Sequence, residues 1–86
     1  PGRGRLRLDP NEMQRRIEQA LPGAVARVEG AEAHFSAVVI AKAFEGKTRI
    51  EQHQMIYALF QKEMAGGEVH ALQLRTVTPD EWEKES

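Results

Sequence analysis

The sequence has no cysteine, which excludes a disulfide scaffold and any metal site built on the chain's own thiolates. It also has no apolar run near the roughly 20 residues that a membrane span needs. Neither sign of charge dominates, because 12 Lys and Arg face 13 Asp and Glu for a net charge of −1. A dedicated nucleic-acid binder usually carries a basic excess. The balanced charge speaks against a dedicated nucleic-acid binder. The missing cysteine and the missing apolar run lead us to expect a cytoplasmic protein with no membrane contact.

The composition, 41% hydrophobic and 29% charged, is typical of a globular domain. A chain of 86 residues forms one domain with a thin core and little room for a deep catalytic pocket. It has no cysteine nucleophile, Gly-x-Ser-x-Gly elbow or phosphate loop, so we do not expect an enzyme, although a paired-carboxylate site stays open. We assign residues 9–86 to the domain and residues 1–8 to a flexible basic leader, either native or added.

Three segments carry a helix-start signal, in which an N-cap residue precedes an acid by three positions: Asp9-Pro10-Asn11-Glu12, Thr48-Arg49-Ile50-Glu51 and Thr78-Pro79-Asp80-Glu81. The first helix should end at Pro22-Gly23 and the second, the longest, at Gly66-Gly67. An apolar stripe in the second helix is predicted to pack in the core: Ile56, Leu59, Phe60 and Met64. The third helix is short, with Trp82 folding back onto the domain.

Three strands are predicted, over residues 24–29, 34–44 and 69–77, with a hairpin connection at 30–33. The short connection makes the first two strands antiparallel. The second and third strands are about 25 residues apart with a helix between them, which allows a right-handed parallel crossover. The predicted fold is therefore α+β, with element order α-β-β-α-β-α and a three-stranded mixed sheet that carries helices on one face.

Two histidines are predicted at one end of this sheet. His34 begins the second strand and His70 begins the third, and neighbouring strands lie about 4.8 Å apart. Imidazole nitrogen is a ligand for zinc, copper and iron. The alternative is that both are surface or packing residues. Two histidines cannot complete a tetrahedral site, so metal binding here would need ligands from another molecule.

The chain resembles the BolA-like family in the order and spacing of several segments: Phe44-Glu45-Gly46-Lys47, Gln52-His53-Gln54 leading to Ile56-Tyr57, and Val69-His70-Ala71-Leu72. The closing Thr78-Pro79-Asp80-Glu81-Trp82 resembles the bacterial YrbA or IbaG type within that family. The resemblance covers about residues 10 to 82. It implies a small α/β domain similar to the class II KH fold, which agrees with the element order above.

The resemblance also implies a partner and a cofactor. BolA-like proteins are associated with monothiol glutaredoxins, in heterodimers that can hold a bridging 2Fe–2S cluster to which the partner and glutathione supply thiolates. The histidine of the family's His-Ala motif falls on His70, and a second ligand, before strand two, falls on His34. The absence of cysteine agrees with this arrangement. We expect an adaptor in iron–sulfur trafficking or iron and stress regulation, which alone is a monomer or weak homodimer.

The alternative function is a nucleic-acid-binding regulator that uses the KH-like surface. Lys47, Arg49 and His53 are its candidate contacts, together with the basic leader. Many relatives have an Arg-His-Arg triplet where this chain has Gln52-His53-Gln54, and the loss of both arginines removes charge that could meet phosphate. The segment 46–49 also lacks the Gly-x-x-Gly clamp of KH domains. DNA binding is therefore the weaker expectation.

Overall fold

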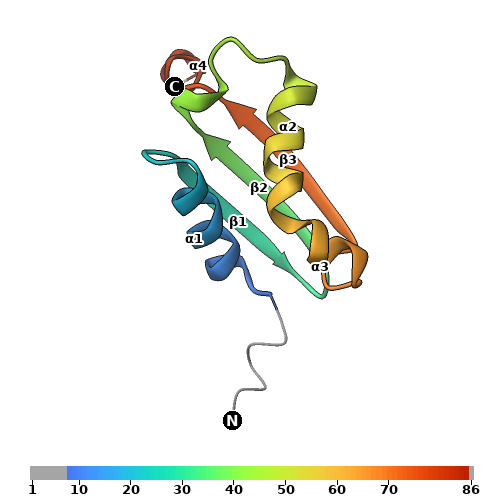
Figure 1. The fold of residues 1–86 in the computed structure, drawn as a ribbon. Helices are drawn as coiled ribbons and strands as arrows, with labels where there is room; N and C mark the ends of the chain where they lie inside the picture. The colour runs from blue at the N-terminus through green and yellow to red at the C-terminus, as the bar shows by residue number, and fades with distance from the viewer. Residues whose placement is uncertain (1–7, 86) are drawn as a thin grey trace.

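The computed structural model describes residues 8–85. The elements follow in the order α1 (Pro10–Ala20), β1 (Val25–Ala31), β2 (His34–Ile40), the 3₁₀ turn η2 (Lys42–Phe44), α2 (Arg49–Tyr57), the 3₁₀ turn η3 (Ala58–Phe60), α3 (Gln61–Ala65), β3 (Ala71–Val77) and α4 (Pro79–Glu85). The predicted order is confirmed (Figure 1). The arginines of the predicted basic leader lie outside the described residues.

The sheet has the predicted mixed topology. β1 pairs antiparallel with β2, β2 pairs parallel with β3, and β2 is the central strand. In the register, His34 lies opposite Ala31 on one side and Ala71 on the other. The start of β2 and the start of β3 therefore lie at one end of the sheet, which is the lower end in Figure 1.

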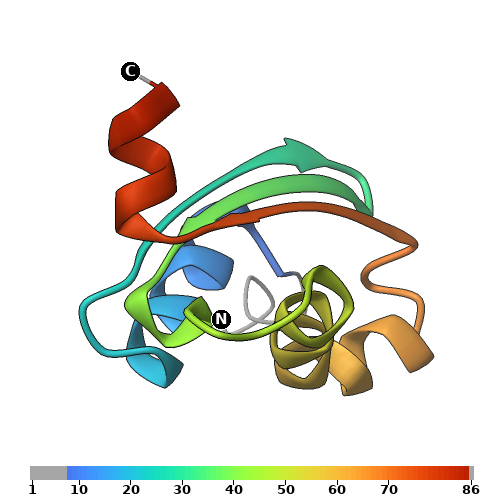
Figure 2. The ribbon, with the colours of Figure 1, turned by 90° about the horizontal axis from the view of Figure 1, so that it is seen from above.

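Helices α1, α2 and α3 form one layer against one face of the sheet, as predicted (Figure 2). The short α4 differs, because it leaves the end of β3 and projects on the other side of the sheet. No residue of α4 is buried, and Trp82 is only partly covered, with the Arg75 guanidinium 6.0 Å from its ring centre. No helix within residues 8–85 is long and apolar enough to cross a membrane.

The core lies between the sheet and this helical layer. Its largest fully buried side chains come from α1, both 3₁₀ turns, α2, β2 and the loop before β3: Met13, Ile17, Phe44, Ile56, Phe60, Val39 and Val69. Leu8 packs against this cluster and is partly buried. Because α1, α2, both 3₁₀ turns and all three strands contribute to one cluster, the described residues form a single hydrophobic core, to which α3 adds no buried residue.

All three predicted helix starts are present. The Asp9 carboxylate accepts a hydrogen bond from the Glu12 amide at 2.8 Å, with Pro10 at the first helical position. Thr48 and Glu51 form a reciprocal capping box at α2. Thr78 and Glu81 form the same pair of bonds at α4, at 2.8 and 3.2 Å. These local signals fix where each helix begins.

The predicted boundaries were wrong for all three strands. β1 spans Val25–Ala31 and not residues 24–29, so Gly30 and Ala31 pair with β2 and the connection is shorter than the predicted 30–33. The strand expected over residues 34–44 ends at Ile40, because the chain turns through η2 and places Phe44 in the core with no exposed surface. The last sheet contact there is the Ala41 amide donating to the Val77 carbonyl at 3.0 Å. The strand expected from residue 69 begins at Ala71, since Val69 is buried in the core and His70 lies in the connection.

The long second helix is interrupted, which the apolar stripe did not predict. The turn η3 separates α2 from α3 and buries Phe60 completely, whereas Met64 is 36% exposed. Arg16 of α1 stabilises this break, because its guanidinium donates to the Leu59 carbonyl at 3.2 Å and to Glu63 at 2.9 Å. The tertiary contact therefore overrides the helical period, and Met64 is wrong as a core residue.

Candidate metal-ligating rim

His34 and His70 lie side by side at the end of the sheet. Their ring centres are 6.2 Å apart and the rings are within 15° of parallel. Both residues are exposed to solvent. The parallel pairing of β2 with β3 produces this proximity, as the sequence predicted. We call these two side chains the histidine rim.

The β1–β2 turn holds both histidines through its backbone carbonyls. The Ala33 carbonyl accepts hydrogen bonds from the His70 amide at 2.7 Å and the Ala71 amide at 3.1 Å. The Glu32 carbonyl lies 3.0 Å from Nδ1 of His34. The two-residue turn therefore contacts one histidine through its ring and the other through its backbone.

The shape of this turn requires unusual backbone angles. Glu32 has φ of 55° and Ala33 has φ of 73°, a region that residues other than glycine rarely adopt. Gly30, with φ of 133°, precedes them, and a Cβ atom there would lie 2.2 Å from the His34 carbonyl oxygen. Only glycine is compatible with position 30, so the turn and the start of β2 are packed as one unit.

A hollow of about 710 Å³ adjoins the histidine rim. It is lined by the start of α1, by the β1–β2 turn, and by Gly67 and Glu68 of the connection that leads to His70. Among the described residues that line it, the charged ones are acidic: Asp9, Glu32 and Glu68. The rim is therefore open to solvent beside a concave, acidic surface, on which a second molecule has room to approach.

The rim alone cannot complete a metal site. Within residues 8–85, no three His, Cys, Asp or Glu side chains lie close enough together to hold an ion. Two imidazoles supply two ligands, whereas an iron–sulfur cluster of the 2Fe–2S type needs four. Paired histidines do ligate such clusters in proteins when thiolates supply the rest. The donor set fits one part of a shared cluster.

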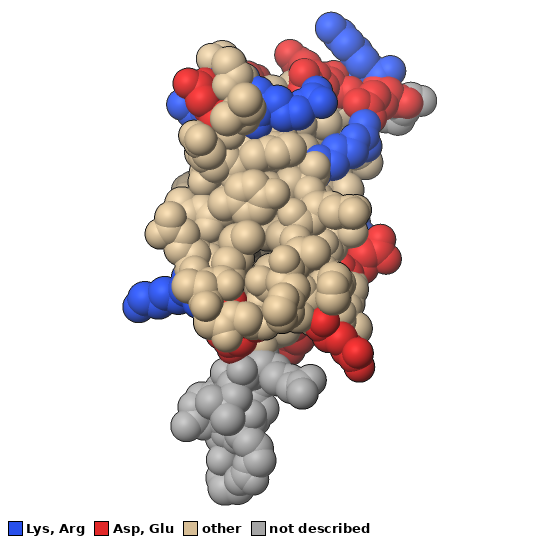
Figure 3. Space-filling model, turned by 90° about the vertical axis from the view of Figure 1, so that its right-hand side faces the viewer, with Lys and Arg blue, Asp and Glu red and all other residues tan. Residues whose placement is uncertain are grey.

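The predicted nucleic-acid contacts lie at the opposite end of the sheet. Lys47 is exposed in the loop before α2, which is the upper end in Figure 1. Arg49 and His53, one turn apart on α2, line a hollow of about 200 Å³ together with Glu81 and Glu85. Figure 3 shows acidic side chains beside the basic ones at this end. The structure therefore gathers these residues but forms no continuous basic surface on that face.

His53 is placed mainly by packing. Its Nε2 atom is buried without a hydrogen-bond partner, and its ring meets Tyr57 edge-on at 6.5 Å. The neighbouring Gln52 is 7% exposed and donates to the Phe44 and Lys47 carbonyls, while its amide oxygen accepts from Thr76. Sequence reasoning missed Gln52 as a buried link between α2, η2 and β3. Its position before an apolar stripe gave no such signal.

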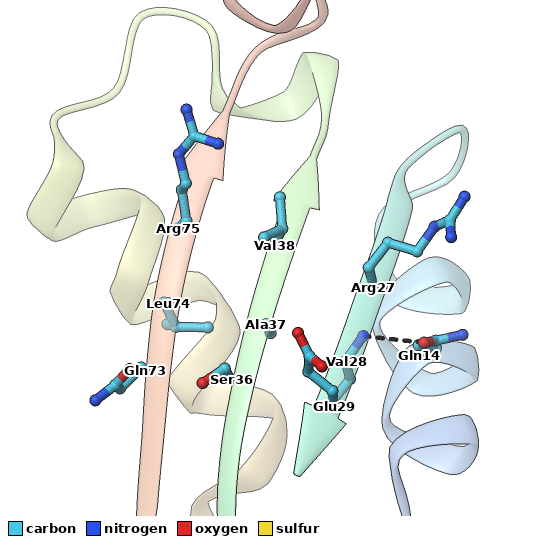
Figure 4. A pocket seen from close by; sticks show the side chains of 10 residues that line it. All are labelled: Gln14, Arg27, Val28, Glu29, Ser36, Ala37, Val38, Gln73, Leu74 and Arg75. Carbon is cyan, nitrogen blue, oxygen red and sulfur yellow. Dashed lines mark hydrogen bonds between the residues drawn. The ribbon is translucent and has the colours of Figure 1, made fainter.

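The uncovered face of the sheet carries a third hollow, of about 500 Å³ (Figure 4). Arg27, Glu29 and Arg75 mix both charges across it, and no aromatic side chain lines it. At its margin the Gln14 side chain accepts a hydrogen bond from the Val28 amide at 2.9 Å, which covers part of the β1 edge. The described residues that line this hollow therefore offer neither a cluster of metal ligands nor an aromatic platform on which a base could stack.

The fold and the rim define a class: a small α+β domain with two exposed histidines and no thiolate. The chain belongs to the BolA-like protein family, whose family model matches residues 10–81. It is 36% identical over 70 residues to a protein from the rpoN–murA intergenic region of Acinetobacter guillouiae, covering 81% of this chain and 84% of that protein. It is 27% identical over 78 residues to the acid stress protein IbaG of Escherichia coli, covering 91% and 93%.

A solved structure confirms the fold independently. The BolA protein homologue from Coxiella burnetii superimposes with a TM-score of 0.76 at 35% identity, over 88% of this chain and 97% of that one. Together with IbaG, these bacterial relatives agree with the YrbA or IbaG type that the sequence predicted. Both the family and the α-β-β-α-β-α fold are therefore confirmed.

Proposed function

We propose that this chain is a non-enzymatic adaptor that pairs with a monothiol glutaredoxin and contributes His70 and His34 to a shared 2Fe–2S cluster. The observation that carries the proposal is the exposed pair of imidazoles, 6.2 Å apart, with no further ligand group assembled around them within residues 8–85. Such a half-site suits a cluster that is completed by another molecule. BolA-like proteins are in general regulators or adaptors, which agrees with this role.

The division of ligands follows from composition. The chain has no cysteine, so any thiolates must come from the partner and from glutathione. His34 and His70 then provide nitrogen, which ligates only as the neutral imidazole. The cluster supplies redox chemistry or iron–sulfur cargo when bound, and the chain supplies the nitrogen ligands and a docking surface. Acid is expected to weaken this complex, because a protonated imidazole has no free lone pair.

The setting we propose is cytoplasmic, in iron–sulfur trafficking or in iron and stress regulation. The Escherichia coli relative is named an acid stress protein, which supports a stress-linked role for this chain. Without its partner the chain is expected to be a monomer or a weak homodimer.

The test mixes the cluster-free chain with a glutaredoxin that already holds a 2Fe–2S cluster, and follows visible circular dichroism. We expect a new spectrum that saturates at one chain per cluster, because nitrogen replaces a ligand. His70→Ala should weaken or abolish this change, whereas His53→Ala, a histidine at the other end of the sheet, should not. An unchanged spectrum with the wild-type chain, or an equal change with His70→Ala, would contradict the proposal.

A further inference from the structure

We infer that the β1–β2 turn selects Nε2 of His34 as its metal-ligating atom, so that Glu32 and Ala33 are positioning residues of the histidine rim that act through their backbone. This inference rests on the proposed function, because the choice of ring nitrogen matters only if His34 ligates a metal. Its direct evidence is a set of contacts within the chain, and these can be measured with no cluster present.

The first step concerns the His34 ring. Its Nδ1 lies 3.0 Å from the Glu32 carbonyl oxygen, within hydrogen-bond distance. A carbonyl oxygen only accepts hydrogen bonds, so the contact is a hydrogen bond only when Nδ1 carries the proton. In the neutral ring the lone pair then remains on Nε2 alone. One contact therefore fixes both the tautomer and the orientation of this ligand, as carbonyl partners of metal-bound histidines commonly do.

The second step concerns His70. Its backbone amide donates to the Ala33 carbonyl at 2.7 Å, and the next amide, that of Ala71, donates to the same oxygen at 3.1 Å. The side chain of His70 has a ring contact with His34 but no hydrogen bond to another residue of 8–85. The turn therefore fixes the position of the His70 backbone but does not determine which nitrogen of the His70 ring carries the proton. The two histidines differ in this respect.

The third step concerns why the turn holds this shape. Glu32 and Ala33 both have positive φ angles, 55° and 73°, so that their carbonyls point to His34 and to the start of β3. Non-glycine residues adopt this region at a cost. Positive φ at both positions is also what the type I′ turn of a two-residue hairpin loop requires, and it sets where the two carbonyls point.

The experiment measures tautomers in the ¹⁵N-histidine-labelled chain at mildly alkaline pH, by two-bond ¹H–¹⁵N correlation spectra. We expect His34 to be predominantly protonated on Nδ1, whereas His70 serves as an internal reference with no hydrogen bond to select a form. The result that would overturn the inference is a His34 ring protonated mainly on Nε2, because the Glu32 carbonyl would then have no proton to accept.

A variant with one glycine inserted between Glu32 and Ala33 tests the cause. Three-residue hairpin loops keep antiparallel pairing, but the inserted residue moves the Glu32 carbonyl away from the ring. The Nδ1–H population of His34 should fall toward that of His70. An insertion between Pro22 and Gly23, in a loop remote from the rim, should leave it unchanged. An equal population in wild type and turn variant would overturn the inference. If the turn variant does not fold, the wild-type tautomer decides alone.

The two proposals fail separately. A chain that has His34 protonated on Nδ1 but takes no cluster from glutaredoxin contradicts the proposed function and leaves the tautomer selection in place. A chain that accepts the cluster but has His34 protonated on Nε2 contradicts only the role of the turn.

Discussion

The three histidines of this chain have different surroundings, and these surroundings separate their roles. His34 and His70 are exposed and face one another at 6.2 Å, while His53 keeps a buried Nε2 atom against Tyr57 and α2. A ligand must reach solvent and offer a lone pair to a second molecule. His34 and His70 are exposed, whereas Nε2 of His53 is buried, so the first two are the candidates for ligation.

At this scale the sequence predicted that His34 and His70 lie together, but not what holds them there. His34 and His70 were found from their places at strand starts, because a parallel pair of strands brings such positions together. The Glu32 and Ala33 carbonyls were missed, since a backbone contact leaves no mark on residue type. The preference for Asn-Gly in such turns would even have favoured different residues at these positions.

The strain in the β1–β2 turn makes a stability prediction. Ala33→Gly should raise the free energy of unfolding by about 0.5–1 kcal/mol, because glycine adopts a φ of 73° without the Cβ clash, which outweighs its larger entropy loss. Urea denaturation measures the change. Ala31→Gly is the matched control: it lies in β1 with extended backbone, so there glycine should destabilise. A loss of stability with Ala33→Gly would contradict the strain described here.

At the scale of elements, the helix caps were the most reliable sequence signals and the element ends the least. Capping residues act within three positions, so the sequence contains the whole interaction. The end of β2 and the break at η3 depend instead on burying Phe44 and Phe60 and on Arg16 reaching across from α1. No local pattern encodes contacts between residues that are 43 positions apart.

The two identical capping boxes should differ in their effect on stability. Thr48→Ala should lower the free energy of unfolding by about 1 kcal/mol, since it removes the cap of α2, which packs Ile56 in the core. Thr78→Ala removes the corresponding bond from α4, in which the Thr78 hydroxyl accepts from the Glu81 amide. Because α4 buries no residue, global stability should change little, while Trp82 fluorescence reports a looser helix. Equal losses of global stability in both variants would show that α4 is part of the cooperative core.

At the scale of the whole molecule, the two groups of candidate residues lie at opposite ends of one small sheet. The histidine rim lies beside an acidic hollow at one end, and the residues considered for nucleic acid lie among mixed charges at the other (Figures 1 and 3). The fold class and topology could be predicted because loop lengths restrict a three-stranded sheet to few arrangements. The hollow beside the rim could not, because it joins α1, the β1–β2 turn and the connection before β3.

The proposed function needs a second molecule that completes the set of metal ligands. The described chain provides two nitrogen donors and a concave surface beside them, and its sequence provides no sulfur. In the proposed function, the domain gains metal chemistry only in a complex. Its net charge of −1 gives it no long-range attraction to nucleic acid, so we favour a protein partner over DNA.

The most direct measurement is pulsed EPR on the reduced complex of glutaredoxin with the ¹⁵N-histidine-labelled chain. Only histidines of this chain carry the label, so strong ¹⁵N hyperfine coupling reports its own ligands. We predict two strongly coupled nitrogens in the wild type, one in His34→Ala, and two in the control His53→Ala. A complex that holds the cluster but shows no strong ¹⁵N coupling would contradict ligation by the histidine rim.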